Sequence, residues 1–135
     1  GISASVYKVA LENTNKIADM VEPFDLDKNT KYPKIYDNPE QTFKDKINQG
    51  IREHREVLSQ YPKQKVKDIV NEEFKVYKKV GAIDFMLLEV YLREWEKQNG
   101  IQCGFGRGSV SGSMIAYLLD VTQMNSLKFN LNFFR

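Results

Sequence analysis

One stretch decides how the fold is interpreted, Cys103-Gly104-Phe105-Gly106-Arg107-Gly108-Ser109-Val110-Ser111-Gly112-Ser113. A β-prone run, residues 101–103, precedes it, and a helix-prone run, residues 114–119, follows it. This order predicts a short strand, a glycine loop and the start of a helix. Such a loop turns backbone N–H groups and the positive end of a helix dipole toward one point. Together with the Arg107 guanidinium, it predicts a site for a phosphorylated ligand.

Two known nucleotide-binding motifs do not fit this loop. A Walker A loop requires Gly-Lys-Ser/Thr, and no lysine lies between Gly104 and Ser113. A dinucleotide fingerprint requires G-x-G-x-x-G, whereas here the glycines alternate and then leave a gap of four, with no acidic residue at the usual distance. Two interpretations stay open: a phosphate cradle of another kind, or a tight strand-to-helix turn that uses glycines only for geometry.

Composition places the chain among soluble globular proteins with one domain. It has 135 residues, of which 41% are hydrophobic and 28% charged. The net charge of +2 is too small to indicate nucleic-acid binding by itself. No apolar run approaches the ~20 residues of a membrane span, so no membrane partner is expected. The single cysteine favours a cytoplasmic location.

The periodicity of apolar residues predicts four long helices. They cover about residues 5–21, 39–61, 65–80 and 83–97, and a polar connector lies over residues 25–37. The last helix is apolar on nearly all sides, which is typical of a central, buried element. Together with the strand before the glycine loop, the pattern predicts an α+β fold, mostly helical with a few short strands.

Two of these helices can be predicted in more detail. Asn38 is expected to cap the second helix, with Pro39 at the first helical position and Gln41 as its capping-box partner. The residues of the third helix expected to face inward are Val66, Ile69, Val70, Phe74 or alternatively Glu73, Tyr77 and Val80.

The other chemically reactive residues form no catalytic pattern. His54, the only histidine, lies on the inward stripe of its helix and is expected to be partly buried and hydrogen-bonded. Cys103 has no second histidine or acid placed nearby, so it is interpreted as a small apolar strand residue. Asp25-Leu26-Asp27 has the spacing of a metal-binding pair but lies in a polar loop, so no two-metal carboxylate site is predicted.

The glycine stretch resembles a family signature. Residues 104–117 resemble G-P-G-R-G-S-A-A-G-S-L-V-A-Y of the bacterial replicative polymerases of family C, the DNA polymerase III alpha subunits. Downstream, residues 121–129 resemble I-T-D-x-D-P-L-x-Y and residues 131–135 resemble L-x-F-E-R. The departures from the signature, which indicate a diverged or phage-borne parent, are Phe105 for proline, Val110-Ser111 for Ala-Ala, Asn125 for aspartate and Phe134 for glutamate.

The resemblance implies a fold and a binding site. The family's palm is similar to the polymerase beta-like nucleotidyltransferases, so residues 1–80 are expected to be a helical region leading into a palm segment, residues 81–135. The Gly-Ser pair that holds the incoming triphosphate at a helix start would be Gly108-Ser109, and Arg107 and Arg135 would contact phosphate oxygens. The other residues expected at the nucleotide are Gly104, Gly106, Gly112 and Ser113.

The resemblance also implies an activity, DNA-directed DNA polymerisation in DNA replication. The implied partners are primer-template DNA, deoxynucleoside triphosphates and other replisome subunits, and the implied cofactor of the full-length enzyme is Mg²⁺. The family's catalytic aspartates follow L-x-F-E-R, so this chain is expected to be a fragment without catalytic or metal-binding residues, to bind no Mg²⁺ and to be inactive alone.

The sequence leaves two alternative functions open and predicts self-association of the chain. The chain could instead belong to an inactive polymerase relative kept for binding, or be an unrelated phosphate-binding module with a structural role. A palm sheet that lacks its remaining strands exposes an edge, which predicts self-association.

Overall fold

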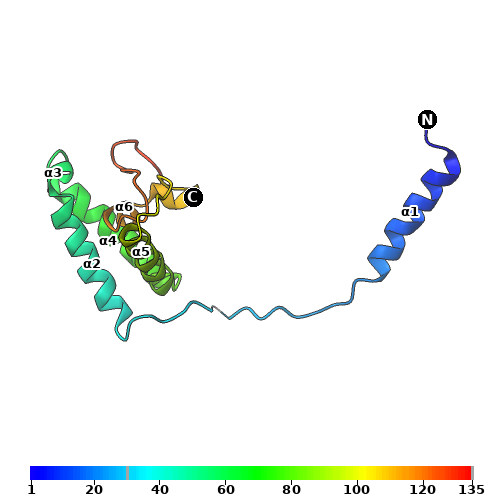
Figure 1. Cartoon of the computed structure of the whole chain (residues 1–135), viewed down its shortest axis with the longest axis horizontal. Helices are drawn as coiled ribbons and strands as arrows, with labels where there is room; N and C mark the ends of the chain where they lie inside the picture. Colours follow the sequence, from blue (N-terminus) through cyan, green and yellow to red (C-terminus); the bar gives the residue numbers. More distant parts are fainter. Residues whose placement is uncertain (30, 135) are drawn as a thin grey trace. The chain divides into compact units, whose positions relative to one another are not determined.

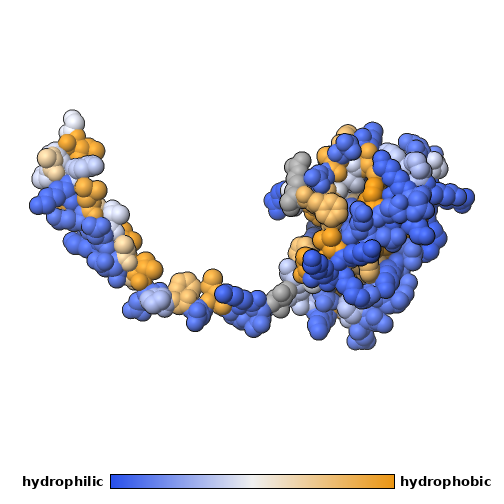
Figure 2. Space-filling model, turned by 180° about the vertical axis from the view of Figure 1, so that it is seen from behind, coloured by the Kyte–Doolittle hydropathy of each residue, from blue (hydrophilic) through white to orange (hydrophobic). Residues whose placement is uncertain are grey.

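The computed structural model describes residues 1–29 and 31–134. It divides the chain into two units, Gly1–Lys31 and Tyr32–Arg135. The first unit contains helix α1, Ala4–Asp19, whose N-terminus is capped by the Ser3 hydroxyl, which accepts the Val6 N–H at 3.4 Å. The predicted helix is thus confirmed, but every residue of α1 is exposed. Figure 2 shows apolar residues interspersed with hydrophilic ones along this unit.

The second unit is a small helical domain. Its helices are α2 (Pro39–Glu53), α3 (Arg55–Leu58), α4 (Lys63–Lys79), α5 (Ile83–Gln98), the 3₁₀ helix η1 (Gly108–Gly112) and α6 (Met114–Leu118). Helix α2 packs against α5 and α6, and α4 packs against α6 (Figure 1). The most deeply buried apolar side chains come from three of these helices, α2, α5 and α6: Phe43, Ile47, Met86, Leu87, Met114, Ile115, Ala116 and Leu118. The short helix α6 therefore lies at the centre of the core.

The predicted α+β class is wrong. Residues 1–29 and 31–134 form helices and loops without a strand. The expected strand over residues 101–103 is not formed because a strand requires a neighbour for its backbone groups. Instead the Ile101 N–H bonds back to the Glu96 carbonyl at 2.9 Å, as part of the end of α5. The sheet edge that suggested self-association is likewise absent from the described part of the chain.

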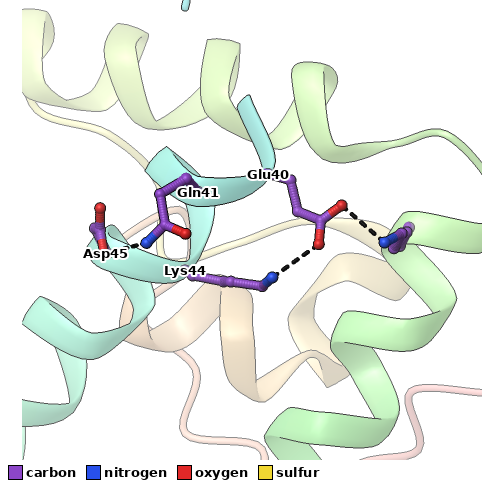
Figure 3. Close-up of polar contacts among 5 residues, drawn as sticks. Glu40, Gln41, Lys44 and Asp45 are labelled. Carbon is purple, nitrogen blue, oxygen red and sulfur yellow. Dashed lines mark hydrogen bonds and ion pairs between the residues drawn. The ribbon is translucent and has the colours of Figure 1, made fainter. Parts of the chain in front are cut away.

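Helix α2 begins at the predicted residue but for a different reason. Pro39 occupies the first turn as expected. The Asn38 side chain makes no capping hydrogen bond, and Gln41 donates to Asp45 Oδ1 at 2.9 Å instead of closing a capping box (Figure 3). The predicted capping box is therefore wrong.

Ion pairs at Glu40 hold this end of α2. Its carboxylate points toward Lys44 in the next turn (Figure 3) and lies 2.8 Å from Lys44 Nζ and 2.8 Å from Lys78 Nζ of α4. The two ammonium groups, Lys44 foremost, lower the pKa of Glu40 to about 2. The start of α2 is thereby connected to the end of α4.

Helix α5 is less buried than its composition predicts. Only Met86, Leu87 and Val90 are buried. Tyr91 and Trp95 remain 48% and 49% exposed. Apolar side chains lie all around α5, but within this unit the neighbouring elements cover only one side of the helix.

Candidate functional site

The glycine loop divides into an exposed part and a buried part. Residues 104–109 are exposed, whereas Gly112 and Ser113 are buried. Gly108 and Ser109, the pair expected at a helix start, are the first two residues of the 3₁₀ helix η1, and the α-helix α6 begins only at Met114. The candidate phosphate-binding surface of the loop is therefore the segment 104–109.

The exposed segment is anchored at its first end. The Phe105 carbonyl accepts the Gln123 N–H at 2.7 Å. Gly106 has φ +141°, and a Cβ there would lie 2.8 Å from Thr122 Oγ1 and 2.9 Å from Ser111 Oγ. Thr122 is itself 1% exposed. Only glycine combines this backbone conformation with so close an approach.

Arg107 lies at the centre of the exposed segment. Its backbone is extended, with φ −143° and ψ 143°. Within residues 1–29 and 31–134, its guanidinium forms no ion pair. Gly108 follows with φ +67°, so the backbone direction changes immediately after the arginine. Arg135, the second predicted phosphate contact, lies outside the described residues.

The segment that receives the loop is itself fixed by side-chain caps. Thr122 Oγ1 accepts the Met124 N–H at 2.8 Å. Asn125 Oδ1 accepts the N–H groups of Leu127 and Lys128 at 3.0 and 3.1 Å. An amide oxygen satisfies both donors just as a carboxylate would. Asn125 can thus replace the aspartate of the family pattern without loss of this turn.

The buried end of the loop is held by Glu73 of α4. Glu73 is 2% exposed. Its Oε1 accepts the Met114 N–H at 2.8 Å, and its Oε2 accepts the Ile115 N–H at 2.9 Å and the Ser113 hydroxyl at 2.7 Å. An anion at a helix N-terminus is favourable because the free N–H groups and the helix dipole point toward it. The start of α6 is thus already occupied by the protein's own carboxylate.

Ser113 is the centre of this hydrogen-bond network. Besides donating to Glu73, its Oγ accepts the Ala116 N–H at 3.0 Å and the Tyr77 hydroxyl at 2.9 Å. Burial raises the pKa of Tyr77 to about 12, with the Glu73 charge contributing in the same direction, so this phenol is a neutral donor. Burial also raises the pKa of Glu73, and its hydrogen bonds oppose that shift.

From the sequence, Glu73 is expected to face inward only as an alternative to Phe74, and no role is predicted for it. A signal was present, because residues 66, 70, 73 and 77 follow helical spacing and all four are buried. A carboxylate in such a stripe needs buried hydrogen-bond donors. Those donors come from residues 113–115, which are 40–42 positions away in sequence.

A cleft of about 800 Å³ opens beside the exposed loop. It is lined by α2, α5 and the residues around Cys103 and Phe105. Cys103, predicted to be an apolar strand residue, is half-buried in a loop and donates to Glu96 Oε2 at 2.6 Å. That contact raises the pKa of the thiol, which disfavours the thiolate that a nucleophile requires.

His54 is partly buried, as predicted, but its Nε2 has no hydrogen-bond partner among the described residues. Its Nε2 lies 3.3 Å from Asp120 Oδ1, yet the two groups are not aligned for a hydrogen bond. The imidazole ring packs against Tyr117, with centroids 4.7 Å apart. We assign it to the packing between α2 and α6.

The described residues offer neither a cluster of metal ligands nor a membrane-spanning helix. They contain no group of three or more His, Cys, Asp or Glu side chains that could hold a metal ion. None of the helices they form combines the length and the apolar character needed to cross a membrane.

Comparison with known proteins shows the family. Residues 40–135 match the model of the bacterial DNA polymerase III alpha NTPase domain. The chain therefore belongs to the DNA polymerase III alpha family. It is similar to the DNA polymerase III subunit alpha of Halalkalibacterium halodurans, with 31% identity over 133 residues, and to that of Helicobacter pylori, with 31% identity over 144 residues. The subunit from Buchnera aphidicola is 35% identical over 85 residues.

These matches cover most of this chain but little of each relative. The alignments include 96%, 93% and 63% of this chain, respectively, and 12%, 12% and 7% of the relatives. The chain thus spans only a small part of the length of each of these relatives.

Proposed function

We propose that this chain is the part of a replicative DNA-directed DNA polymerase that holds the incoming deoxynucleoside triphosphate. The observation that carries the proposal is the exposed glycine loop, residues 104–109, with Arg107 at its centre, in a chain of the DNA polymerase III alpha family. For the whole enzyme we propose primer-template DNA and the other replisome subunits as partners, and the cytoplasm as its location.

The chemistry of the loop suits a triphosphate. Phosphoryl transfer is catalysed mainly by positioning and by neutralising charge on the phosphate oxygens. The guanidinium of Arg107 can bind two phosphate oxygens at once. The backbone amides of Gly104, Gly106 and Gly108 and the hydroxyl of Ser109 supply neutral donors beside it. Arg135 is proposed as a second cation.

Gly112 and Ser113 are proposed to support the exposed segment from the buried end of the loop. Both are buried, and a Cβ on Gly112 would lie 2.5 Å from the Asn132 carbonyl oxygen. The Ser113 hydroxyl already has three hydrogen-bond partners. Their contribution to nucleotide binding is therefore to keep segment 104–109 in place.

Magnesium is proposed for the whole enzyme and not for this chain. Mg²⁺ prefers carboxylate oxygens, and the described residues contain no carboxylate cluster that fits the ion. The chain alone is proposed to bind nucleotide without catalysing its transfer.

The test is a calorimetric titration of the chain with each deoxynucleoside triphosphate. Arg107→Ala is expected to weaken binding by about tenfold or more, because a charge-assisted pair is lost. Arg55→Ala, an exposed arginine on α3, is the matched control and should bind as the wild type does. No binding by the wild type, or equal binding by Arg107→Ala, would refute the proposal. Equal affinity for inorganic pyrophosphate would favour a general phosphate-binding module instead.

A further inference from the structure

We infer that Glu73 is the positioning residue of the glycine loop. From helix α4 its carboxylate holds Ser113, at the buried end of the loop, and the next two residues, Met114 and Ile115. It thereby sets where segment 104–109 presents its N–H groups. The ligand named in the test, a deoxynucleoside triphosphate, rests on the function proposed above. The role of Glu73 in shaping the loop does not.

The first support is the number and arrangement of the bonds. One carboxylate accepts hydrogen bonds from Ser113, Met114 and Ile115, at 2.7, 2.8 and 2.9 Å. Both oxygens are used, and the group is 2% exposed, so water does not compete for these donors. Three consecutive residues are thus fixed to a single side chain of another helix.

The second support is the weakness of α6 by itself. It has five residues, which is far shorter than an isolated helix that is stable in water. Its first N–H groups have no partner within the helix. Glu73 satisfies two of them, and the Ser113 hydroxyl satisfies a third, that of Ala116. The start of α6 therefore depends on α4.

The third support is the short distance from this anchor to the exposed loop. Only residues 109–112 separate Ser113 from Gly108. Together with Gly108 they form the 3₁₀ helix η1, and the Ser113 N–H closes it onto the Val110 carbonyl at 3.0 Å. The other end of the loop is held where the Phe105 carbonyl meets the Gln123 N–H. A loop fixed at both ends changes shape when either end moves.

The geometry also explains why a glutamate is required. Glutamine has the same shape but only one acceptor oxygen and adds an NH₂ donor. In Glu73→Gln that NH₂ group would face either the Met114 N–H or the donors from Ser113 and Ile115. The NH₂ group and the donor opposite it would then face each other with no acceptor between them. Residues 113–115 would have to move.

The experiment compares Glu73→Gln with the wild-type chain in two measurements. Amide NMR spectra of the free protein are expected to show shifted signals for Gly106 and Gly108. Calorimetric titration is expected to show triphosphate binding weakened on the order of tenfold, the loss that corresponds to one charge-assisted hydrogen bond. Val66→Ala is the matched control, a buried position on the same helix, and should destabilise the chain without moving these signals or the affinity.

The outcomes separate the two proposals. If Glu73→Gln, like Val66→Ala, changes neither the Gly106 and Gly108 signals nor the affinity for the triphosphate, the positioning role is refuted. If the wild type binds no triphosphate, the proposed function fails, while the signals of the free protein still decide the role of Glu73. Should Glu73→Gln not fold, Ser113→Ala removes only the hydroxyl contacts and is expected to shift the same signals by less. Unchanged Gly106 and Gly108 signals in Ser113→Ala would refute the positioning role of Glu73.

Discussion

Gly50 of α2 lies directly against the carbonyl oxygen of Leu118 in α6. A Cβ built on Gly50 would be 2.0 Å from that oxygen, and both partners are buried. The backbones of the two helices are therefore in contact. This contact holds α6, and with it the end of the glycine loop, against α2.

Replacing Gly50 by alanine should destabilise the domain. The new methyl group cannot fit without separating α2 from α6, and overpacking of this kind typically costs about 1–3 kcal/mol. Urea denaturation followed by circular dichroism measures the change. Gly104→Ala is the control, because a Cβ there has no atom within 4 Å. Equal stability of the two variants would contradict the close contact.

Asn125 should tolerate aspartate but not alanine. Its side-chain oxygen accepts two backbone N–H groups, from Leu127 and Lys128. Asn125→Asp keeps both acceptor contacts, whereas Asn125→Ala leaves both donors unsatisfied, which costs about 0.5–2 kcal/mol for a cap of this type. Thermal denaturation of the two variants compares them. A destabilised aspartate variant beside an unchanged alanine variant would be inconsistent with this turn.

The pH dependence of stability should report the burial of Glu73. Burial raises its pKa above the ordinary value of 4.5, so the folded state binds the proton more tightly than the unfolded state does. The contribution of this group to stability is then fully present below 4.5 and decreases as the pH rises through the folded-state pKa. Tyr77, which faces the same serine, titrates only near 12 and does not interfere.

The measurement is the free energy of unfolding of the wild type minus that of Glu73→Gln, from pH 4 to pH 8. Glutamine does not titrate, so the difference isolates this carboxyl group. We expect the difference to fall as the pH rises. A difference that increases with pH would mean that the hydrogen bonds outweigh the burial.

Glu40 should show the opposite behaviour at acid pH. Lys44 and then Lys78 lower its pKa from 4.5 to about 2, so its contribution to stability is present above 4.5 and is lost as the pH falls toward 2. Carbon NMR titration of the Glu40 carboxyl measures this directly. Lys44→Ala should raise the pKa more than Lys78→Ala, and an unshifted pKa in both variants would contradict the ion pairs.

The chain alone should not extend a primer. The described residues contain no carboxylate cluster for the metal ions that nucleotidyl transfer uses. A primer-extension assay with Mg²⁺ and the four deoxynucleoside triphosphates is expected to give no product, next to a complete polymerase as the positive control. Magnesium-dependent extension by the pure chain would overturn this expectation.

Local features of the fold could be predicted from the sequence. Gly81 and Gly100 follow the ends of α4 and α5 with φ +68° and +67°, because a left-handed residue after a helix is favoured as glycine. The inward positions Phe43 and Ile47 of α2 are likewise buried as their spacing predicts. Features of this kind can be predicted because the information lies within a few neighbouring residues.

Features that depend on distant residues could not be predicted. Residues 101–103 have the composition of a strand, but no neighbouring strand exists in the described chain to pair with them. Trp95 is apolar, but its burial depends on what covers α5. Glu73 could be recognised as unusual on its stripe, yet its partners at Ser113 and beyond become neighbours only when α4 and α6 pack together. The loop could thus be located from the sequence, whereas its anchor could not.

The bonds from Glu73 also determine when the loop can form during folding. Residues 113–115 are joined to a side chain about forty positions earlier, and contacts of such separation form late because the intervening chain must first be closed into a loop. The loop therefore acquires its shape only after α4 has docked. By linkage, any ligand that binds only the assembled loop also protects α4 from local unfolding. Slower hydrogen exchange at the backbone amides of α4 would report that protection, and slower exchange at the Met114 and Ile115 amides would report the persistence of their bonds to Glu73.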